Sequence, residues 1–228
     1  MANARRIAVA IDGPSGAGKS TLARRAAQAL RLLYVDTGAI YRTAALYLLR
    51  READLRSEAA VAALLPEIRI TLDYDGAGGQ RMRLNGEDVT GLIRTQEISM
   101  AASVVSAHPS VRRFLLDMQR KLAEENAVIM DGRDIGTVVL PGADVKIFLT
   151  ASSEARARRR WLELRERGED CDFDRLLQET RQRDADDANR AAAPLRPAED
   201  GVVLDTTSLN FEESLAKLIE IIRERTRI

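Results

Sequence analysis

An octapeptide near the start of the chain constrains its fold more than any other feature. Residues 13 to 20 read Gly-Pro-Ser-Gly-Ala-Gly-Lys-Ser, a complete G-x-x-x-x-G-K-[ST] sequence. Its glycines let backbone N–H groups close around phosphate oxygens without a Cβ in the way, and a helix that follows directs the positive end of its dipole at them. In this pattern Lys19 meets the outer phosphates and the hydroxyl of Ser20 holds magnesium. The octapeptide therefore predicts a protein that handles phosphate groups.

The residues on both sides of the octapeptide support this interpretation. Upstream, residues 6–12 form a short apolar run typical of a buried parallel strand, and downstream, residues 21–30 are rich in helix formers. The alternative is a glycine turn without a ligand, but such a turn needs no Lys-Ser pair after its last glycine.

The composition restricts the cofactors and partners of the chain. Its 228 residues have a formal net charge of zero, so bulk electrostatics give no reason to expect a nucleic acid or a membrane as partner. Residues 1–6 are polar and precede the first strand, so we expect no signal peptide and a cytoplasmic protein. With one cysteine, Cys171, and one histidine, His108, any metal must be a hard cation such as Mg²⁺, held by oxygen and phosphate. Nothing indicates an obligate partner chain, so we expect a monomer.

Five short apolar segments alternate with helical stretches along the chain. This alternation predicts an α/β fold in which a five-stranded parallel sheet is flanked by helices. The segments span residues 7–12, 32–36, 127–131, 144–150 and 202–205. Ligands bind at the carboxyl ends of such strands, and four of the five segments end at or next to an aspartate. These are Asp12, Asp36, Asp131 and Asp205.

The second and third apolar segments are separated by about ninety residues, far more than one crossover helix needs. Residues 68–74 alternate like an antiparallel strand, residues 75–79 form a glycine-rich turn, and residues 81–84 followed by Asn85-Gly86 resemble a strand entering a tight hairpin. We therefore expect an inserted antiparallel hairpin.

The hairpin sets the expected domain boundaries. We assign residues 1–62 and 98–228 to the core and residues 63–97 to a small β-containing insert, where such a fold would place a second substrate. Two helices, about residues 95–107 and 110–125, are expected after the hairpin, with Pro109 suited to the first turn of the second.

Residues 152–196 carry eleven arginines and no lysine, which predicts an arginine-rich lid at about residues 152–190. The alternative is a bias in composition, because 31 of the 35 basic residues of the chain are arginine. An arginine in this region therefore needs a place within a motif before it is assigned to a phosphate.

Three further motifs follow in order along the chain. They are Leu-Tyr-Val-Asp-Thr-Gly-Ala-Ile-Tyr-Arg at residues 33–42, Met-Asp-Gly-Arg-Asp-Ile-Gly-Thr at residues 130–137 and Arg-Asp-Ala-Asp-Asp-Ala-Asn-Arg at residues 183–190. Together with the octapeptide they resemble the bacterial cytidylate kinases, from the first strand to the last helix. The hairpin insert is distinctive of these enzymes among the nucleoside monophosphate kinases. One departure is Ser20 beside Thr21, where many relatives have Gly-Thr, so either hydroxyl can be the magnesium ligand.

The resemblance implies a P-loop kinase core with a nucleotide-binding insert and a lid, which transfers the γ-phosphoryl group of Mg-ATP to CMP or dCMP. It implies these catalytic residues: Lys19, Arg133, Arg183 and Arg190. It implies these ATP-binding residues: Gly13, Pro14, Ser15, Gly16, Ala17, Gly18, Lys19, Ser20 and Thr21. It implies these CMP-binding residues: Thr37, Tyr41, Arg42, Ser103, Arg112, Arg133, Asp134, Arg183 and Asp187. Magnesium would be held by Ser20 and, through water, by Asp131.

Two aspartates have structural alternatives. Asp131 ends a strand where an aspartate typically orients magnesium, and we favour this role; the alternatives are a helix N-cap and an ion pair with a neighbouring arginine. Asp36 lies at a strand-to-helix turn, which favours aspartate on structural grounds alone.

The implied reaction is consistent with the residue types. A phosphate monoester loses its second proton at about pH 6, so no general base is needed, and no histidine occurs in any motif. Arginines supply the charge that two anionic substrates require. The alternatives are a P-loop kinase of a small hydroxyl metabolite such as shikimate, which would need a base, and a nucleotide-sensing module without turnover. A nucleic-acid-dependent ATPase is disfavoured by the neutral charge and by only nine aromatic residues.

Overall fold

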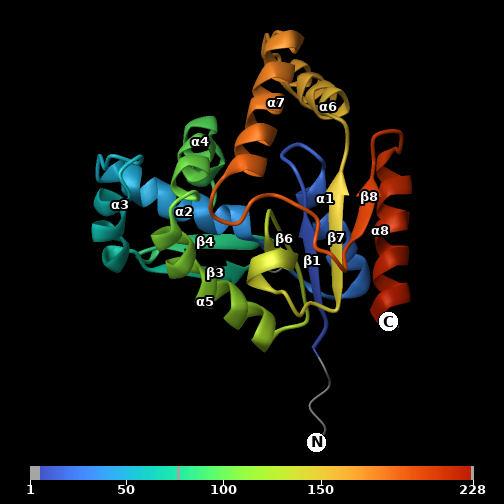
Figure 1. Ribbon diagram of the computed structural model, residues 1–228, viewed down its shortest axis with the longest axis horizontal. Helices are drawn as coiled ribbons and strands as arrows, with labels where there is room; N and C mark the ends of the chain where they lie inside the picture. Colours follow the sequence, from blue (N-terminus) through green and yellow to red (C-terminus); the bar gives the residue numbers. More distant parts are fainter. Residues whose placement is uncertain (1–5, 76–77, 227–228) are drawn as a thin grey trace, which may run out of the picture.

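The computed structural model describes residues 6–75 and 78–226. Residues 1–5 of the polar N-terminal segment and residues 76 and 77 of the expected glycine-rich turn lie outside the described residues. The predicted α/β fold is confirmed, with a parallel sheet in the strand order β2-β6-β1-β7-β8 (Figure 1). Its strands are β1 (Ala8–Asp12), β2 (Leu33–Asp36), β6 (Val128–Gly132), β7 (Val145–Thr150) and β8 (Val202–Asp205).

Helices cover both faces of this sheet, because the central strand buries side chains on both sides. In β1, Val9 and Ile11 pack in an apolar cluster with α1 (Lys19–Leu30) and α8 (Phe211–Thr226). Ala10, between them, faces a second cluster that includes α2 (Thr37–Arg50). Such a strand is apolar throughout, which is why the sequence shows short continuous runs.

A second, antiparallel sheet lies beside α2 and is formed by β3 (Ile70–Tyr74), β4 (Gln80–Leu84) and β5 (Glu87–Asp88). Asn85 and Gly86 join β4 to β5 with φ angles of 50° and 92°. Two successive left-handed residues make the tight hairpin turn that Asn-Gly favours. The strand after this turn, β5, has only two residues and leaves no pattern in the sequence.

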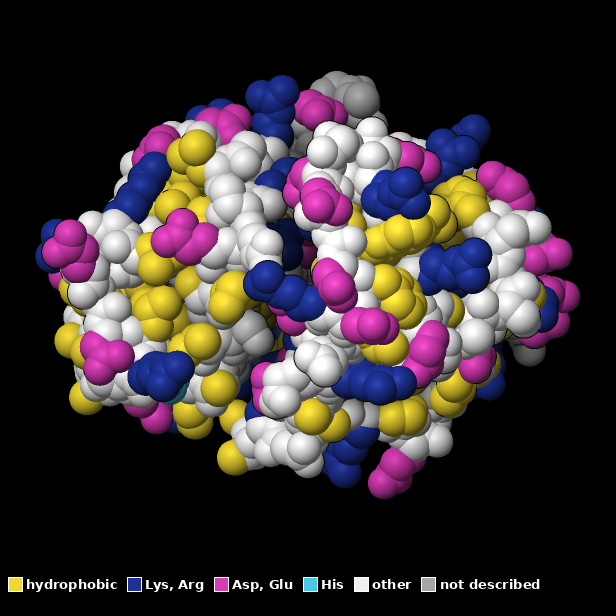
Figure 2. Space-filling view, turned by 90° about the horizontal axis from the view of Figure 1, so that it is seen from above, with side chains coloured by type: hydrophobic (Ala, Val, Ile, Leu, Met, Phe, Trp, Pro, Cys, Tyr) yellow, Lys and Arg dark blue, Asp and Glu magenta, His cyan; other side chains and the backbone are white. Residues whose placement is uncertain are grey.

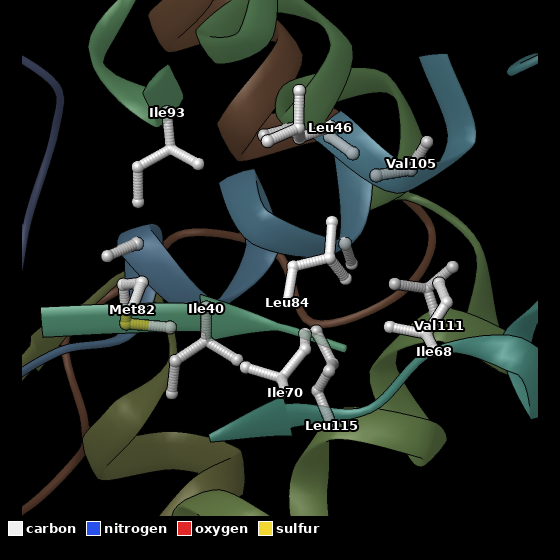
Figure 3. Packing of buried hydrophobic residues seen from close by; sticks show 14 of the residues in the cluster. Ile40, Leu46, Ile68, Ile70, Met82, Leu84, Ile93, Val105, Val111 and Leu115 are labelled. Atoms are coloured by element: carbon white, nitrogen blue, oxygen red, sulfur yellow. The ribbon is translucent and has the colours of Figure 1, made fainter. Parts of the chain in front are cut away.

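Two short 3₁₀ helices (η) and three α-helices lie next to the insert in the chain. They are α3 (Glu58–Leu64), η1 (Leu65–Glu67), η2 (Leu92–Arg94), α4 (Gln96–Val105) and α5 (Pro109–Glu125). Figure 3 shows how the insert packs: Ile70, Met82 and Leu84 of its sheet meet Ile40 of α2 and Leu115 of α5. The insert therefore shares an apolar cluster with helices of the core.

Two helices in the arginine-rich region stand beyond the carboxyl end of β7 (Figure 1). They are α6 (Ser153–Glu166) and α7 (Phe173–Asn189), and they pack against each other. A short π-helical segment, η3 (Ile135–Val139), follows β6. Within residues 6–75 and 78–226, no helix has the length and apolar character that a membrane span requires.

Candidate active site

The octapeptide forms a loop between β1 and α1. Gly13 has a φ of 148°, and a Cβ at this position would lie 1.9 Å from the carbonyl oxygen of Leu149 in β7. Gly18 has a φ of 85° and immediately precedes α1. Both positions therefore require glycine, the first for a close approach and the second for a left-handed backbone. Lys19 is buried, and its Nζ donates a hydrogen bond to the carbonyl oxygen of Pro14 at 2.7 Å.

The electrostatics around Lys19 suit an anion. Burial, together with the positive charge of Arg133, lowers the pKa of Lys19 well below its ordinary value, although Asp131 and Asp12 act in the opposite direction. A bound phosphate would restore the charged form, because an anion at hydrogen-bond distance favours the ammonium.

Asp131, at the end of β6, accepts hydrogen bonds from the hydroxyls of Ser20 at 2.7 Å and Tyr34 at 3.0 Å. Burial raises the pKa of Asp131 to about 6, and the nearby Asp36 contributes in the same direction. Neither structural alternative for Asp131 is observed among the described residues, since it caps no helix and pairs with no arginine. Ser20 and Asp131 thus form an oxygen pair beside the phosphate loop.

Asp36 and Asp12 have structural roles instead. The Asp36 carboxylate caps α2 by accepting from the N–H of Ala39 at 3.0 Å, and it pairs with Arg42 at 2.9 Å. The carboxylate of Asp12 accepts from the N–H groups of Ile135 and Gly136, both at 2.7 Å. Burial nevertheless raises the pKa of Asp12 to about 6.

A cluster of arginines and aspartates faces the loop from β6, α5 and the end of α7. Arg133 Nε donates to Asp187 at 2.9 Å, and Arg112 pairs with Asp134. Arg190 lies 3.8 Å from Asp134 and 3.9 Å from Asp187. These three arginines therefore share two carboxylates, Asp134 and Asp187, which offset part of their charge.

Two guanidinium groups in the cluster have unused donors. The buried Nη2 of Arg190 makes no hydrogen bond to any described residue. The Arg183 guanidinium forms no ion pair or hydrogen bond within the described part of the chain. Burial lowers the pKa of both Arg183 and Arg190, with Arg133 and Arg112 respectively adding to the effect. Donors of this kind favour an additional anion.

These side chains line one cavity of about 400 Å³. In Figure 2, which looks onto this end of the molecule, basic and acidic side chains meet in a depression near the centre. The structure brings together in it most of the site residues expected from the sequence: Ser15, Gly16, Gly18, Lys19, Ser20, Thr21, Thr37, Tyr41, Arg42, Ser103, Arg112, Asp131, Arg133, Asp134, Arg183, Asp187 and Arg190. The other three, Gly13, Pro14 and Ala17, are buried residues of the loop that do not line the cavity.

Sequence reasoning missed several residues that line the cavity. They are Gly38, Ser99, Ala102, Ser106, Gly132 and Glu163. Ser99, Ala102, Ser103 and Ser106 lie on one face of α4 and its end, at helical spacing. A stripe of small residues at this spacing was the signal that could have indicated them.

Arg156 in α6 was also missed as a support of the phosphate loop. It donates to the carbonyl oxygens of Ser15 and Ala151, both at 2.9 Å, and its Nη1 and Nη2 pair with the two carboxylate oxygens of Asp184 in α7, at 3.0 and 2.5 Å. Because Arg156 is only 4% exposed, it is a structural link from α6 to the loop and to α7. Its role differs from that of the surface pair Arg181–Glu154.

A loop for one set of phosphates and unused arginine donors across the same cavity suit a transfer between two anionic molecules. On a parallel sheet of this kind, that arrangement defines a P-loop kinase. The family model described as cytidylate kinase matches residues 9–224, and the chain belongs to the cytidylate kinase family.

Individual relatives support the same family. The chain is 46% identical to the cytidylate kinase of Syntrophotalea carbinolica over 224 residues, which cover 98% of this chain and 95% of that protein. It is 50% identical to the cytidylate kinase of an Enterobacter species, over 95% of each chain. A solved structure of an uncharacterized protein from Eubacterium ventriosum shares the fold, with a TM-score of 0.51 at 13% identity, covering 96% of this chain and 100% of that one.

Proposed function

We propose that this protein transfers the γ-phosphoryl group of Mg-ATP to CMP or dCMP, giving ADP and CDP or dCDP. Membership of the cytidylate kinase family supports the substrates. The observation that carries the proposal is the position of Arg133, Arg183 and Arg190, which line the same cavity as the phosphate loop. Guanidinium groups there offset the charge of two nucleotides and of the equatorial oxygens in the transition state.

We assign the acceptor phosphate to Arg42 and Arg133, with help from Thr37 and Tyr41. The Thr37 hydroxyl already donates to the carbonyl oxygen of Asp131 at 2.8 Å, which fixes its side chain. The acceptor phosphate is largely a dianion at neutral pH and needs no base to activate it. Arg183 and Arg190 would close over the reacting phosphates, and Asp187 would contact the sugar.

The base is assigned to Asp134, Arg112 and Ser103. Arg112 is held by Asp134 and by the carbonyl oxygen of Ser106, to which its Nη1 donates at 3.1 Å. Cytosine offers an amino donor at N4 with acceptors at N3 and O2, which matches a carboxylate beside a guanidinium. Uracil would direct its O4, an acceptor, toward the carboxylate of Asp134, and neither group would then have a hydrogen-bond donor.

Magnesium fits the Ser20–Asp131 pair, because oxygen donors are what this cation prefers. When bound with ATP, magnesium supplies charge neutralisation at the phosphates. Ser20 is favoured over Thr21 as its ligand, since the hydroxyl of Ser20 contacts Asp131. We infer that Asp131 acts through water.

An ADP-release assay across the ribo- and deoxyribonucleoside monophosphates, with Mg²⁺ and ATP, tests this function. We expect CMP and dCMP to give the highest kcat/KM, and shikimate, as a small hydroxyl acceptor, to give none. A Lys19→Met variant controls for contaminating kinases and should lose about 100-fold or more of the activity. Tight ATP binding without turnover on any acceptor would instead favour the nucleotide-sensing alternative.

A further inference from the structure

The strand β2 forms one edge of the parallel sheet, and side chains of the insert hydrogen-bond to backbone groups on its outer side. On the inner side, the N–H of Leu33 donates to Ala127 at 2.9 Å, so alternate residues direct their backbone groups outward. There the hydroxyl of Tyr74 donates to the carbonyl oxygen of Tyr34 at 3.1 Å. The Gln80 amide bridges both backbone groups of Asp36, accepting from its N–H at 2.8 Å and donating to its carbonyl oxygen at 3.2 Å.

Asp36 connects this bridge to the proposed acceptor site. Its backbone is held by Gln80, while its carboxylate caps α2 and pairs with Arg42 at 2.9 Å. The position of the Arg42 guanidinium therefore depends on Asp36, and the backbone of Asp36 is fixed by a residue from another sheet. The path therefore runs from the Gln80 amide to the backbone of Asp36, and from the Asp36 carboxylate to the Arg42 guanidinium.

Gln80 itself lies outside the acceptor cavity. It lines a second cavity of about 450 Å³, between the insert and the start of α2, whose wall it shares with Asp36 and Arg42. Asp36 and Arg42 also line the first cavity, whereas Gln80 does not. Gln80 is therefore linked to a nucleotide in the first cavity through Asp36, whose carboxylate holds Arg42 and caps α2.

We propose that Gln80 is a positioning residue, through which the insert sets the Arg42 guanidinium for the acceptor phosphate. This inference rests on the proposed function, since that function gives Arg42 its role. Loss of the bridge frees the backbone at Asp36 and widens the range of positions open to the Arg42 guanidinium. Misplacement of a phosphate-binding group by a fraction of an ångström raises KM or lowers kcat without any change in the residues that touch substrate.

The first test replaces Gln80 with Met, which keeps the length and removes the amide. We expect KM for CMP to rise about tenfold, with KM for ATP changed by less than about twofold. Tyr74→Phe is the matched control, because it removes a hydrogen bond to the same strand edge but none to Asp36, and it should leave both constants unchanged. Gln80→Asn, whose shorter amide cannot bridge both groups, provides a second variant should the first fold poorly.

A double-mutant cycle separates positioning from general damage. In an Arg42→Met background, Gln80→Met should raise KM for CMP far less than in the wild-type background, because the two residues act along one path. Amide hydrogen exchange at Asp36 and Ala39 in the ligand-free protein should accelerate in Gln80→Met and not in Tyr74→Phe.

The outcomes distinguish this inference from the proposed function. Full additivity in the cycle, or an unchanged KM for CMP in a folded Gln80→Met protein, overturns the positioning role and leaves the kinase activity intact. Wild-type protein that phosphorylates no cytidine monophosphate overturns the function, and the role of Gln80 toward the acceptor with it.

Discussion

Three arginines of the cavity are paired with carboxylates: Arg42 with Asp36, Arg112 with Asp134 and Arg133 with Asp187. Like charges that converge on one cavity would repel each other strongly at low dielectric, and the alternating aspartates offset this repulsion. A nucleotide in the proposed site would have to take these arginines from their carboxylates, whereas Arg183 and Arg190 offer donors that are not in use.

We expect Asp134→Ala to reduce kcat/KM for CMP and to lower the ratio of kcat/KM for CMP to kcat/KM for UMP. The substitution removes the acceptor for the N4 amine and also the repulsion that excludes O4 of uracil, a contrast worth about 10- to 100-fold in specificity. Steady-state kinetics on both nucleotides measure the ratio. Glu163→Ala, which removes another carboxylate lining the same cavity, should leave the ratio as it is. An unchanged ratio in Asp134→Ala would remove Asp134 from the base pocket.

Asp12 makes the stability of the ligand-free protein dependent on pH. Its pKa is raised from 3.8 to about 6 in the folded protein, so the native state holds this proton more tightly than the unfolded state does. The stabilisation is fully present below about pH 4 and is lost as the pH rises through 6.

We expect the free energy of unfolding of the wild type, relative to Asp12→Asn, to fall by up to about 3 kcal/mol between pH 4 and pH 7. The Asn variant does not titrate and serves as the reference. Urea unfolding at several pH values measures the difference. A constant difference across this range would show that the Asp12 carboxyl has an ordinary pKa.

Helices α6 and α7, which we propose to act as a lid, differ in how they are attached. In α6, Arg156 is buried and bound to the phosphate loop and to α7, whereas α7 buries Asp187 toward the cavity. Arg159 ties α6 to the carbonyl oxygen of Thr206 at 2.6 Å, after β8. The lid helices are therefore connected to the core mainly by polar contacts, which can exchange partners more easily than an apolar cluster can repack.

We expect Arg156→Met to raise KM for ATP about tenfold and to lower the free energy of unfolding by about 2 to 4 kcal/mol. The reason is that the carbonyl oxygens of Ser15 and Ala151 and the carboxylate of Asp184 all lose their partner. Kinetics and thermal unfolding measure the two effects. Arg181→Met removes an exposed arginine from the same pair of helices and is expected to change neither by much. Equal effects in both variants would contradict a specific role for Arg156.

Much of this architecture could be predicted from the sequence, because its signals are local. The five core strands are continuous apolar runs, and Asn85-Gly86 specifies its turn through backbone conformation alone. The π-helical η3 and the two-residue β5 were not predicted, since neither has a periodic pattern long enough to detect.

The site was predictable to the extent that its residues lie in contiguous motifs. Arg156 and Gln80 were missed for the opposite reason: each acts on residues more than forty positions away, and a single sequence does not record such pairings. The compositional excess of arginine also concealed which guanidinium groups face the cavity.

At the scale of the whole molecule, the site lies between the insert and the proposed lid helices, which are joined to the core by different kinds of contact. The insert shares an apolar cluster with α2 and α5, while the lid is held by polar contacts. Closing these parts over two bound nucleotides would exclude water and prevent hydrolysis of ATP. We expect the lid helices to move further than the insert.

A bisubstrate analogue that links the two nucleotides should lower the radius of gyration from the value of about 17 Å expected for a folded chain of this length. Small-angle scattering with and without the analogue measures the change. The Arg183→Met variant, which lacks one arginine of the lid, should compact less. Identical scattering curves for the free and bound wild type would show that closure is absent or too small to matter.

The seating of the insert against β2 has one more consequence. An uncovered outer strand is a template on which another copy of the same chain can add, and proteins avoid polymerising in this way by blocking the exposed rim. Tyr74 and Gln80 occupy the hydrogen-bonding positions that an incoming strand would need. A form of the protein without the insert would therefore lose more than part of a nucleotide site: it would gain a surface prone to self-association.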